Sequence, residues 1–147
     1  MKVELVHEGG LAFRTAAGAH SVLLDARAPI GKDSGPTPKE MLLAAVAGCS
    51  AMDVAASLRK ARVTPERFVI TAAGTPRSEH PRIFPRIDVL IDVSGSGIDP
   101  SVVVHGVVDS LTKYCGVSAM VAPTSPIFWR VVVNGTEAGT GQAKFDQ

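Results

Sequence analysis

The stretch TPKEMLLAAVAGCSAMDVAASLRKAR, residues 37–62, reads as one long and almost wholly apolar helix. Its start carries three helix signals: Thr37 suits the N-cap, Pro38 suits the first helical position, and Glu40 stands three residues after Thr37. Together they form a capping box with a proline at the first position. We therefore predict a helix over residues 38–62. A helix that is apolar on nearly all sides needs the rest of the chain, or a second subunit, packed around it.

Charged and small side chains indicate that this segment is a core helix and not a membrane span. Asp53 interrupts the apolar run, and Arg59, Lys60 and Arg62 stand at its end. Alanines and a glycine fill its middle, and small residues let two helices approach at the short end of the roughly 8–10 Å packing range. We therefore expect a close crossing with a second helix, from this chain or from a partner.

Composition argues against several function classes. The chain has 147 residues, which favours one domain, and a formal net charge of +1 without a basic run longer than two residues. One Trp and one Tyr do not supply the stacking aromatics of a nucleic-acid binder, and nothing better supports a membrane surface. The first residues, MKVELVHEGG, lack the apolar core of a signal peptide, so we predict a cytoplasmic protein. The four histidines lack the spacing of metal ligands, and the chain has no CxxC motif. We therefore predict no metal site and no cofactor.

The residues before the helix predict an antiparallel meander. Residues 2–7 and 11–15 alternate apolar and polar side chains on either side of Gly9-Gly10. That pattern is typical of a hairpin, and residues 20–25 predict a third strand. The Gly- and Pro-containing residues 28–36 predict a loop that leads into the helix.

The residues after the helix predict more strands and a second helix. We expect strands over residues 67–75, 82–94 and 126–134. Asp99 as an N-cap and Pro100 as the first helical residue predict a helix over residues 100–114. This helix should break at Cys115-Gly116.

This order of elements predicts an α+β fold. The order is β-β-β-α-β-β-α-β, and strands before and after the helices favour antiparallel sheet. We place a single domain over residues 1–134. The remaining tail, residues 135–147, is rich in Gly and Thr, and we predict that it is flexible.

Two cysteines, Cys49 and Cys115, are the candidates for chemistry. Taken alone, each cysteine fits a buried thiol or one without a functional role, because free cysteine is among the most buried residue types. The two predicted helices should pack together, which would bring the thiols within disulfide range. Such a pair suits a peroxidatic thiol and a resolving thiol that captures its sulfenic acid. The first thiol would need a nearby cation to lower its pKa.

Two motifs and the strand-first order resemble a known superfamily. The sequences TPKEMLLAAVAGCSAMDV and KYCGVSAMV are similar to those of the osmotically inducible protein C and organic hydroperoxide resistance superfamily (OsmC/Ohr). The resemblance extends over residues 1–134 and is strongest to an OsmC-like branch with an SPxEM…GGCS motif. It implies antiparallel sheets wrapped around long central helices in an intertwined homodimer, with active sites at the dimer interface.

The same resemblance implies an activity. It is the thiol-dependent reduction of organic hydroperoxides as part of an oxidative stress response. Cys49 would be the peroxidatic residue and Cys115 the resolving residue. An external dithiol, such as a lipoyl protein, would return both thiols to the reduced state.

The activating residues of that superfamily are only partly present. Its glutamate follows the helix proline directly, where this chain has Lys39, and Glu40 comes one residue later. One residue turns a helical side chain by about 100°, so Glu40 is either a catalytic residue or only the capping-box acid. The arginine that the superfamily places after a glycine pair is replaced by Leu11. Arg14 and Arg27 are substitutes by region, and Arg14 fits a solvated strand residue.

Three functions therefore stay open on the sequence. The first is a cysteine-based hydroperoxide reductase. The second is a non-enzymatic OsmC-like protein that binds a small molecule or responds to redox state, which the incomplete activating pair favours. The third is a plain dimeric structural protein. The pKa of Cys49 separates the first two, since an activated thiol lies below the ordinary value of about 8.5.

Overall fold

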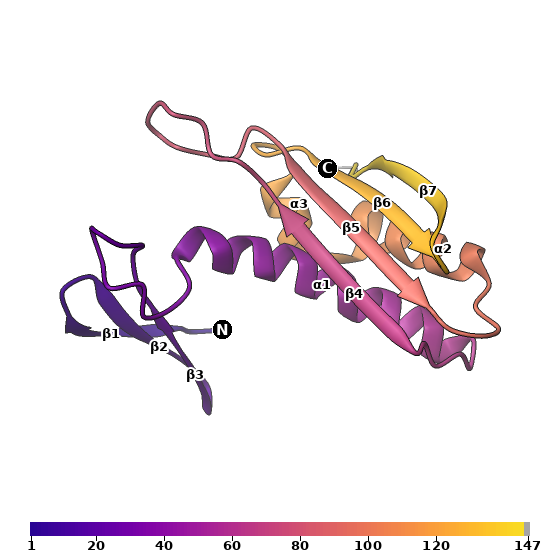
Figure 1. The fold of residues 1–147 in the computed structure, drawn as a ribbon, viewed down its shortest axis with the longest axis horizontal. Coiled ribbons are helices and arrows are strands. Elements are labelled where there is room, and N and C mark those ends of the chain that lie inside the picture. The colour runs from indigo at the N-terminus through magenta and orange to yellow at the C-terminus, as the bar shows by residue number, and fades with distance from the viewer. Residues whose placement is uncertain (146–147) are drawn as a thin grey trace. The chain divides into compact units, whose positions relative to one another are not determined.

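A computed structural model describes residues 1–145 of the chain (Figure 1). It contains two compact units, Met1–Leu42 and the residues from Leu43 onward. The long helix α1 (Pro38–Lys60) begins in the first unit and continues into the second. The two units are described separately below, and the single domain predicted over residues 1–134 stays a prediction.

The first unit is a three-stranded antiparallel sheet followed by a loop. Its strands are β1 (Glu4–Gly9), β2 (Ala12–Ala17) and β3 (His20–Leu24), in the order β1-β2-β3. The predicted meander is confirmed, including the turn at the glycine pair. Short local signals were sufficient here, because each strand pairs with its neighbour in sequence.

Asp25 anchors the loop that leads into α1. Its side chain is 3% exposed and accepts hydrogen bonds from the Ser34 hydroxyl at 2.7 Å and from the Ser34 and Lys32 amides at 3.1 Å. The Ala26 amide adds a fourth at 2.7 Å. These bonds, led by that of the Ser34 hydroxyl, lower the pKa of Asp25 to about 2. The loop therefore has a defined shape at neutral pH.

Helix α1 starts as predicted and packs one face in the core. The Glu40 carboxylate accepts from the Thr37 amide at 2.7 Å, and the Glu40 amide donates to the Thr37 hydroxyl at 3.3 Å, which is the capping box. By length and apolar composition alone α1 is able to cross a membrane. Its buried residues are Val46, Ala47, Ser50, Val54 and Leu58. Met52 is 71% exposed, so in a single chain the expected coat covers one face only.

The second unit holds a four-stranded mixed sheet. Its strands are β4 (Arg67–Ala73), β5 (Ile87–Ser94), β6 (Ile127–Val133) and β7 (Thr136–Gln142), in the order β4-β5-β6-β7. The predicted α+β class is confirmed, but strands β5 and β6 are parallel, so this sheet is mixed and the antiparallel prediction is wrong for this pair. The chain between them is long and helical, which is the crossover that parallel neighbours require.

Strand β7 corrects the predicted flexible tail. Residues 136–142 pair antiparallel with β6. The turn before them, Asn134-Gly135, has positive φ at both residues, the geometry of a two-residue hairpin. An Asn-Gly pair after an apolar strand is a strong hairpin signal, so the sequence did contain this strand. Residues 146–147 of the predicted tail lie outside the described residues.

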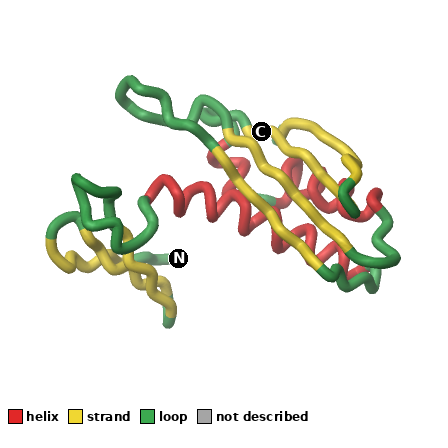
Figure 2. The backbone as a smooth tube through the Cα atoms, viewed as in Figure 1, coloured by secondary structure: helices red, strands yellow, loops and turns green. Residues whose placement is uncertain are grey.

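Helices cover one face of this sheet (Figures 1 and 2). Helix α2 (Pro100–Asp109) continues into the π-helical turn η1 (Ser110–Tyr114), and α3 (Gly116–Val121) follows after Cys115. The predicted helix over 100–114 therefore changes its winding halfway, and the predicted break at Cys115 is confirmed. A Cβ on Gly106 of α2 would lie 3.0 Å from the Ser57 hydroxyl of α1, so the two helices cross closely, as predicted.

Alternation in the strands places the core between sheet and helices. In β5, every second residue is buried: Ile87, Val89, Ile91 and Val93. They join apolar residues of α1 and α2, such as Val54 and Val107, in one core cluster. This core fixes α1 against the segment that carries Cys115, which positions the candidate site.

Candidate thiol site

The structure brings the two cysteines together in the second unit. Cys49 lies in α1 and is half-buried, while Cys115 lies between η1 and α3 and is fully buried. Both are free thiols, and the Cys115 side chain lies near enough to Cys49 to raise its pKa. Packing of the two helical segments therefore brings the cysteines near each other, and a separation within disulfide range stays a prediction.

Cys115 is held by the segments on both sides of it. It is the N-cap residue of α3, with an extended backbone (ψ of 94°), and its sulfur accepts a hydrogen bond from the Ser118 amide at 3.3 Å. Its thiol also donates to the Ser118 hydroxyl at 3.1 Å. On the other side, the Cys115 amide donates to the carbonyl of Ser110 at 2.9 Å. The sulfur thus has a fixed direction before any reaction.

The surroundings of Cys49 disfavour its thiolate. Burial, then the hydrogen bond and charge of Cys115, raise the pKa of Cys49 to about 11. The Asp53 carboxylate adds to this increase, and only the backbone N–H of Val117 opposes it. No cation acts on this thiol among the residues that the structure describes. With such a pKa, about one thiol in ten thousand is ionised at pH 7.

A cation with carboxylate partners occurs in the first unit instead. Arg27 donates from one guanidinium nitrogen to Asp33 and from another to Glu40. Hydrogen bonds from Thr37, and then from Arg27, lower the pKa of Glu40, and Asp33 and Glu40 raise that of Arg27. Glu40 therefore caps α1 and also binds an arginine, and its catalytic role stays a prediction.

The other candidate arginine is engaged elsewhere. Arg14 donates to the exposed carboxylate of Glu8, with one contact of 2.8 Å. This agrees with its interpretation as a solvated strand residue. The partner role of Asp33 toward Arg27 was not foreseen, because it depends on how the loop after Asp25 folds.

An apolar pocket of about 490 Å³ lies beside Arg27 within the first unit. Its apolar lining comes from the three-stranded sheet: Leu5, Leu11, Phe13 and Leu24. Arg27 and Lys39 also line it. Pockets of this kind, mostly apolar with few polar groups, suit the organic part of a small molecule.

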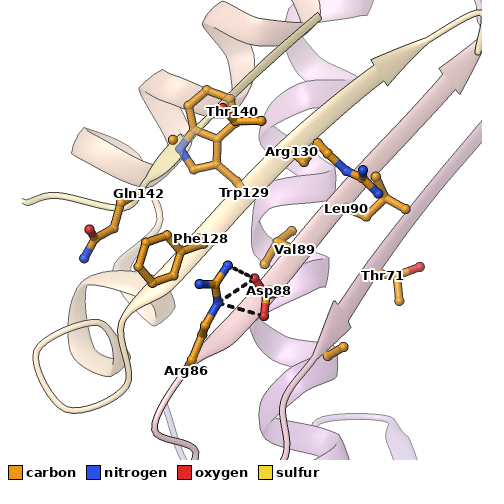
Figure 3. A pocket seen from close by; sticks show the side chains of 12 residues that line it. Thr71, Arg86, Asp88, Val89, Leu90, Phe128, Trp129, Arg130, Thr140 and Gln142 are labelled. Atoms are coloured by element: carbon orange, nitrogen blue, oxygen red, sulfur yellow. Dashed lines mark hydrogen bonds and ion pairs between the residues drawn. The ribbon is translucent and has the colours of Figure 1, made fainter. Parts of the chain in front are cut away.

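A second cavity, of about 790 Å³, lies on the sheet of the second unit and contains neither cysteine (Figure 3). Arg86 there is engaged by Asp88, with one contact at 2.8 Å, and stacks on the Phe128 ring at 4.0 Å. Its lining has no nucleophile matched with a base, so the cysteine pair remains the candidate site. Among the described residues, no group of three or more His, Cys, Asp or Glu is arranged to hold a metal ion.

Comparisons with known proteins identify the family and several similar proteins. Residues 31–130 match the family model described as OsmC-like protein. Protein YhfA of Escherichia coli K12 is 35% identical over 112 residues, which cover 76% of this chain and 81% of that protein. A crystal structure of a hypothetical protein from Aquifex aeolicus VF5 superposes with a TM-score of 0.76 at 28% identity, covering 90% of this chain and 96% of that one. The fold also matches an organic hydroperoxide resistance protein OsmC from Legionella pneumophila, with a TM-score of 0.64 at 14% identity over 90% of this chain and 96% of that one.

Proposed function

The chain belongs to the OsmC-like protein family, and we propose that it is a cysteine-based reductase of organic hydroperoxides. The family and the structural relatives point to peroxide or redox stress chemistry. The single observation that carries the finer proposal is that Cys115 lies near enough to Cys49 to act on its pKa. Neighbouring thiols of different exposure fit an attacking residue that meets the substrate and a resolving residue that does not.

The reaction has two steps on the protein. The Cys49 thiolate attacks the distal peroxide oxygen, the O–O bond breaks, and the alkoxide takes a proton and leaves as an alcohol. Cys49 is then a sulfenic acid. The Cys115 sulfur attacks that sulfur, an S–S bond forms, and the hydroxide that leaves takes the Cys115 proton and departs as water. An external dithiol, for which a lipoyl protein is the family's expectation, reduces the disulfide by exchange and becomes oxidised itself.

The first step needs a cation at Cys49, and Arg27 is our candidate. A cation within about 4–6 Å lowers the pKa of an acidic group by about 1–3. Arg27 is held in one orientation by Glu40 and Asp33. We propose that the protein is a homodimer, in which this pair from a second copy meets Cys49 and the apolar pocket takes the organic part of the peroxide. A reducing compartment such as the cytoplasm would keep both thiols reduced between turnovers.

The test uses full-length protein, cumene hydroperoxide and a dithiol. Wild type should consume peroxide and form an intramolecular Cys49–Cys115 disulfide when the dithiol is left out, seen as a loss of two hydrogens in intact mass. Cys49→Ala should abolish both. Cys115→Ala should form a Cys49 sulfenic acid that dimedone traps but no intramolecular disulfide. A wild type that consumes no organic peroxide with any dithiol would end the proposal.

One observation favours a different function. The raised pKa of Cys49, to which Asp53 contributes, is what a thiol without an enzymatic role would show. The alternative is a protein that kept the fold and binds a small molecule or responds to redox state. Iodoacetamide reaction of Cys49 against pH decides between them: an inflection at or above about 8.5 favours the binding protein, and one below it favours the reductase.

A further inference from the structure

Asp53 is a polar residue near the thiols that the proposed reaction does not use. It follows Cys49 by four residues in α1, so both lie on the same side of the helix. Its Oδ2 accepts a hydrogen bond from the Ser110 hydroxyl at 2.7 Å. The Ser50 hydroxyl lies 3.4 Å from that of Ser110, and both serines are fully buried.

Ser110 is the first residue of the π-helical turn η1. Its side chain binds α1 through Asp53, and its carbonyl accepts the amide of Cys115 at 2.9 Å. Two hydrogen bonds therefore connect the Asp53 side chain to the backbone of the resolving cysteine. Short π segments inside helices are frequent at functional sites, where they redirect the residues that follow. Here the residue that follows the turn is Cys115.

The charge of Asp53 argues against a role in activating Cys49. A carboxylate near a thiol opposes its ionisation, and Asp53 does raise the pKa of Cys49. A group that opposes ionisation of Cys49, but is connected through Ser110 to the backbone of Cys115, contributes to the second step or to the fold.

We propose that Asp53 is a positioning residue for disulfide formation: through Ser110 it fixes the η1 turn so that Cys115 faces Cys49. This inference rests on the proposed function only in calling Cys115 the resolving residue. Sequence reasoning did not reach it, because Asp53 and Ser110 are 57 residues apart.

Three variants separate the hydrogen bond from the charge. Ser110→Ala removes the donor and keeps the charge. Asp53→Asn removes the charge, and its amide oxygen still accepts from Ser110. Asp53→Ala removes both. Ser57→Ala is the matched control, because Ser57 lies on α1 and its hydroxyl donates to the Asp53 carbonyl at 3.2 Å without touching the carboxylate.

The rate of Cys49–Cys115 disulfide closure is measured with diamide, a thiol oxidant that needs no peroxidase activity. One thiolate adds to its N=N bond, and the second displaces the reduced hydrazine as the disulfide forms. Closure in Ser110→Ala and Asp53→Ala should be roughly tenfold slower or more, since small misplacements of reacting groups have effects of this size. Closure in Asp53→Asn and Ser57→Ala should stay within about threefold of wild type.

A second readout separates positioning from a merely structural role. Iodoacetamide reaction of Cys49 at pH 8 should be faster in Asp53→Asn than in wild type, because the neighbouring negative charge is gone. It should be no slower in Ser110→Ala, whose Cys49 keeps its helix. If Ser110→Ala closes as fast as wild type, or Asp53→Asn closes as slowly as Asp53→Ala, the positioning role is wrong. A wild type that closes with diamide and consumes no peroxide contradicts the proposed function and leaves this inference intact.

Discussion

The two units of the chain differ in the reactive groups that they contain. The unit from Leu43 onward holds both thiols, and the described groups that act on Cys49 include a carboxylate and no cation. The unit Met1–Leu42 holds no cysteine, and in it Arg27 is oriented by Glu40 and Asp33 beside an apolar pocket. From this difference we propose that neither unit is a peroxidase site alone, and that the proposed reaction needs an assembly that brings Arg27 to Cys49.

The largest effect that tests this comparison is expected from Arg27→Ala. Without the cation, the pKa of Cys49 should rise by about 1–3, so the second-order rate with cumene hydroperoxide should fall by about 10- to 1,000-fold. Arg14→Ala is the control, because Arg14 pairs with Glu8 at an exposed position, and it should stay within about twofold of wild type. Equal losses in the two variants would show that Arg27 has no special role.

A smaller effect is expected from Glu40→Gln. The amide oxygen still accepts from Thr37 at the start of α1, and Arg27 keeps Asp33 as a partner. The peroxide rate should therefore fall by less than about tenfold, because one of two charge-assisted bonds on Arg27 remains. The steady-state rate of peroxide consumption, measured with saturating dithiol, reports this loss. A loss as large as that of Arg27→Ala would make Glu40 catalytic in its own right.

Thr37→Ala should change stability and leave the chemistry almost untouched. The Thr37 hydroxyl accepts from the Glu40 amide at 3.3 Å and donates to its carboxylate at 2.9 Å. Loss of an N-cap of this type lowers the free energy of unfolding by about 1 kcal/mol, measurable by urea denaturation. A peroxide rate that falls along with stability would show that the cap also holds the Arg27–Glu40 pair.

The smallest and most local effect concerns the loop that holds Arg27. The pKa of Asp25 is lowered to about 2 in the folded chain, below the ordinary value of about 3.9. Its stabilising contribution is therefore complete above about pH 4 and is lost as the pH falls toward 2. The protection of the Lys32 and Ser34 amides, which donate to Asp25, should fall over that range when their exchange rates are compared with the intrinsic rates at each pH. Asp25→Asn should show lower protection at neutral pH and little change in protection between pH 4 and 2.

Local signals in the sequence predicted much of the fold. The capping box fixed the start of α1, and the glycine pair fixed the first hairpin. Long-range geometry was harder to predict. The parallel pairing of β5 with β6 depends on a crossover connection, and no residue pattern in either strand indicates that pairing. Strand β7 was not predicted, although the Asn134-Gly135 pair is a signal for the turn that precedes it.

The candidate site shows the same division. The cysteines were identified by type and by resemblance, and the packing of α1 against the Cys115 segment made them neighbours. The sequence limits the candidate arginines to Arg14 and Arg27 but does not show which of them pairs with Glu40. Arg27 reaches Glu40 across 13 residues through a loop whose shape depends on four hydrogen bonds to Asp25. Such a loop has no periodic pattern from which its geometry follows.

The most direct test of the central claim is the pH dependence of iodoacetamide reaction at Cys49 in Cys115→Ala, with and without Arg27→Ala. Removing Cys115 leaves a single reactive thiol, so the profile reports Cys49 alone. If the assembled protein brings Arg27 to Cys49, the inflection should lie below about 8.5 and move up by about 1–3 pH units in the double variant. An inflection at or above about 8.5 that does not move when Arg27 is removed would contradict the account and leave the chain as a binding protein on the OsmC-like fold.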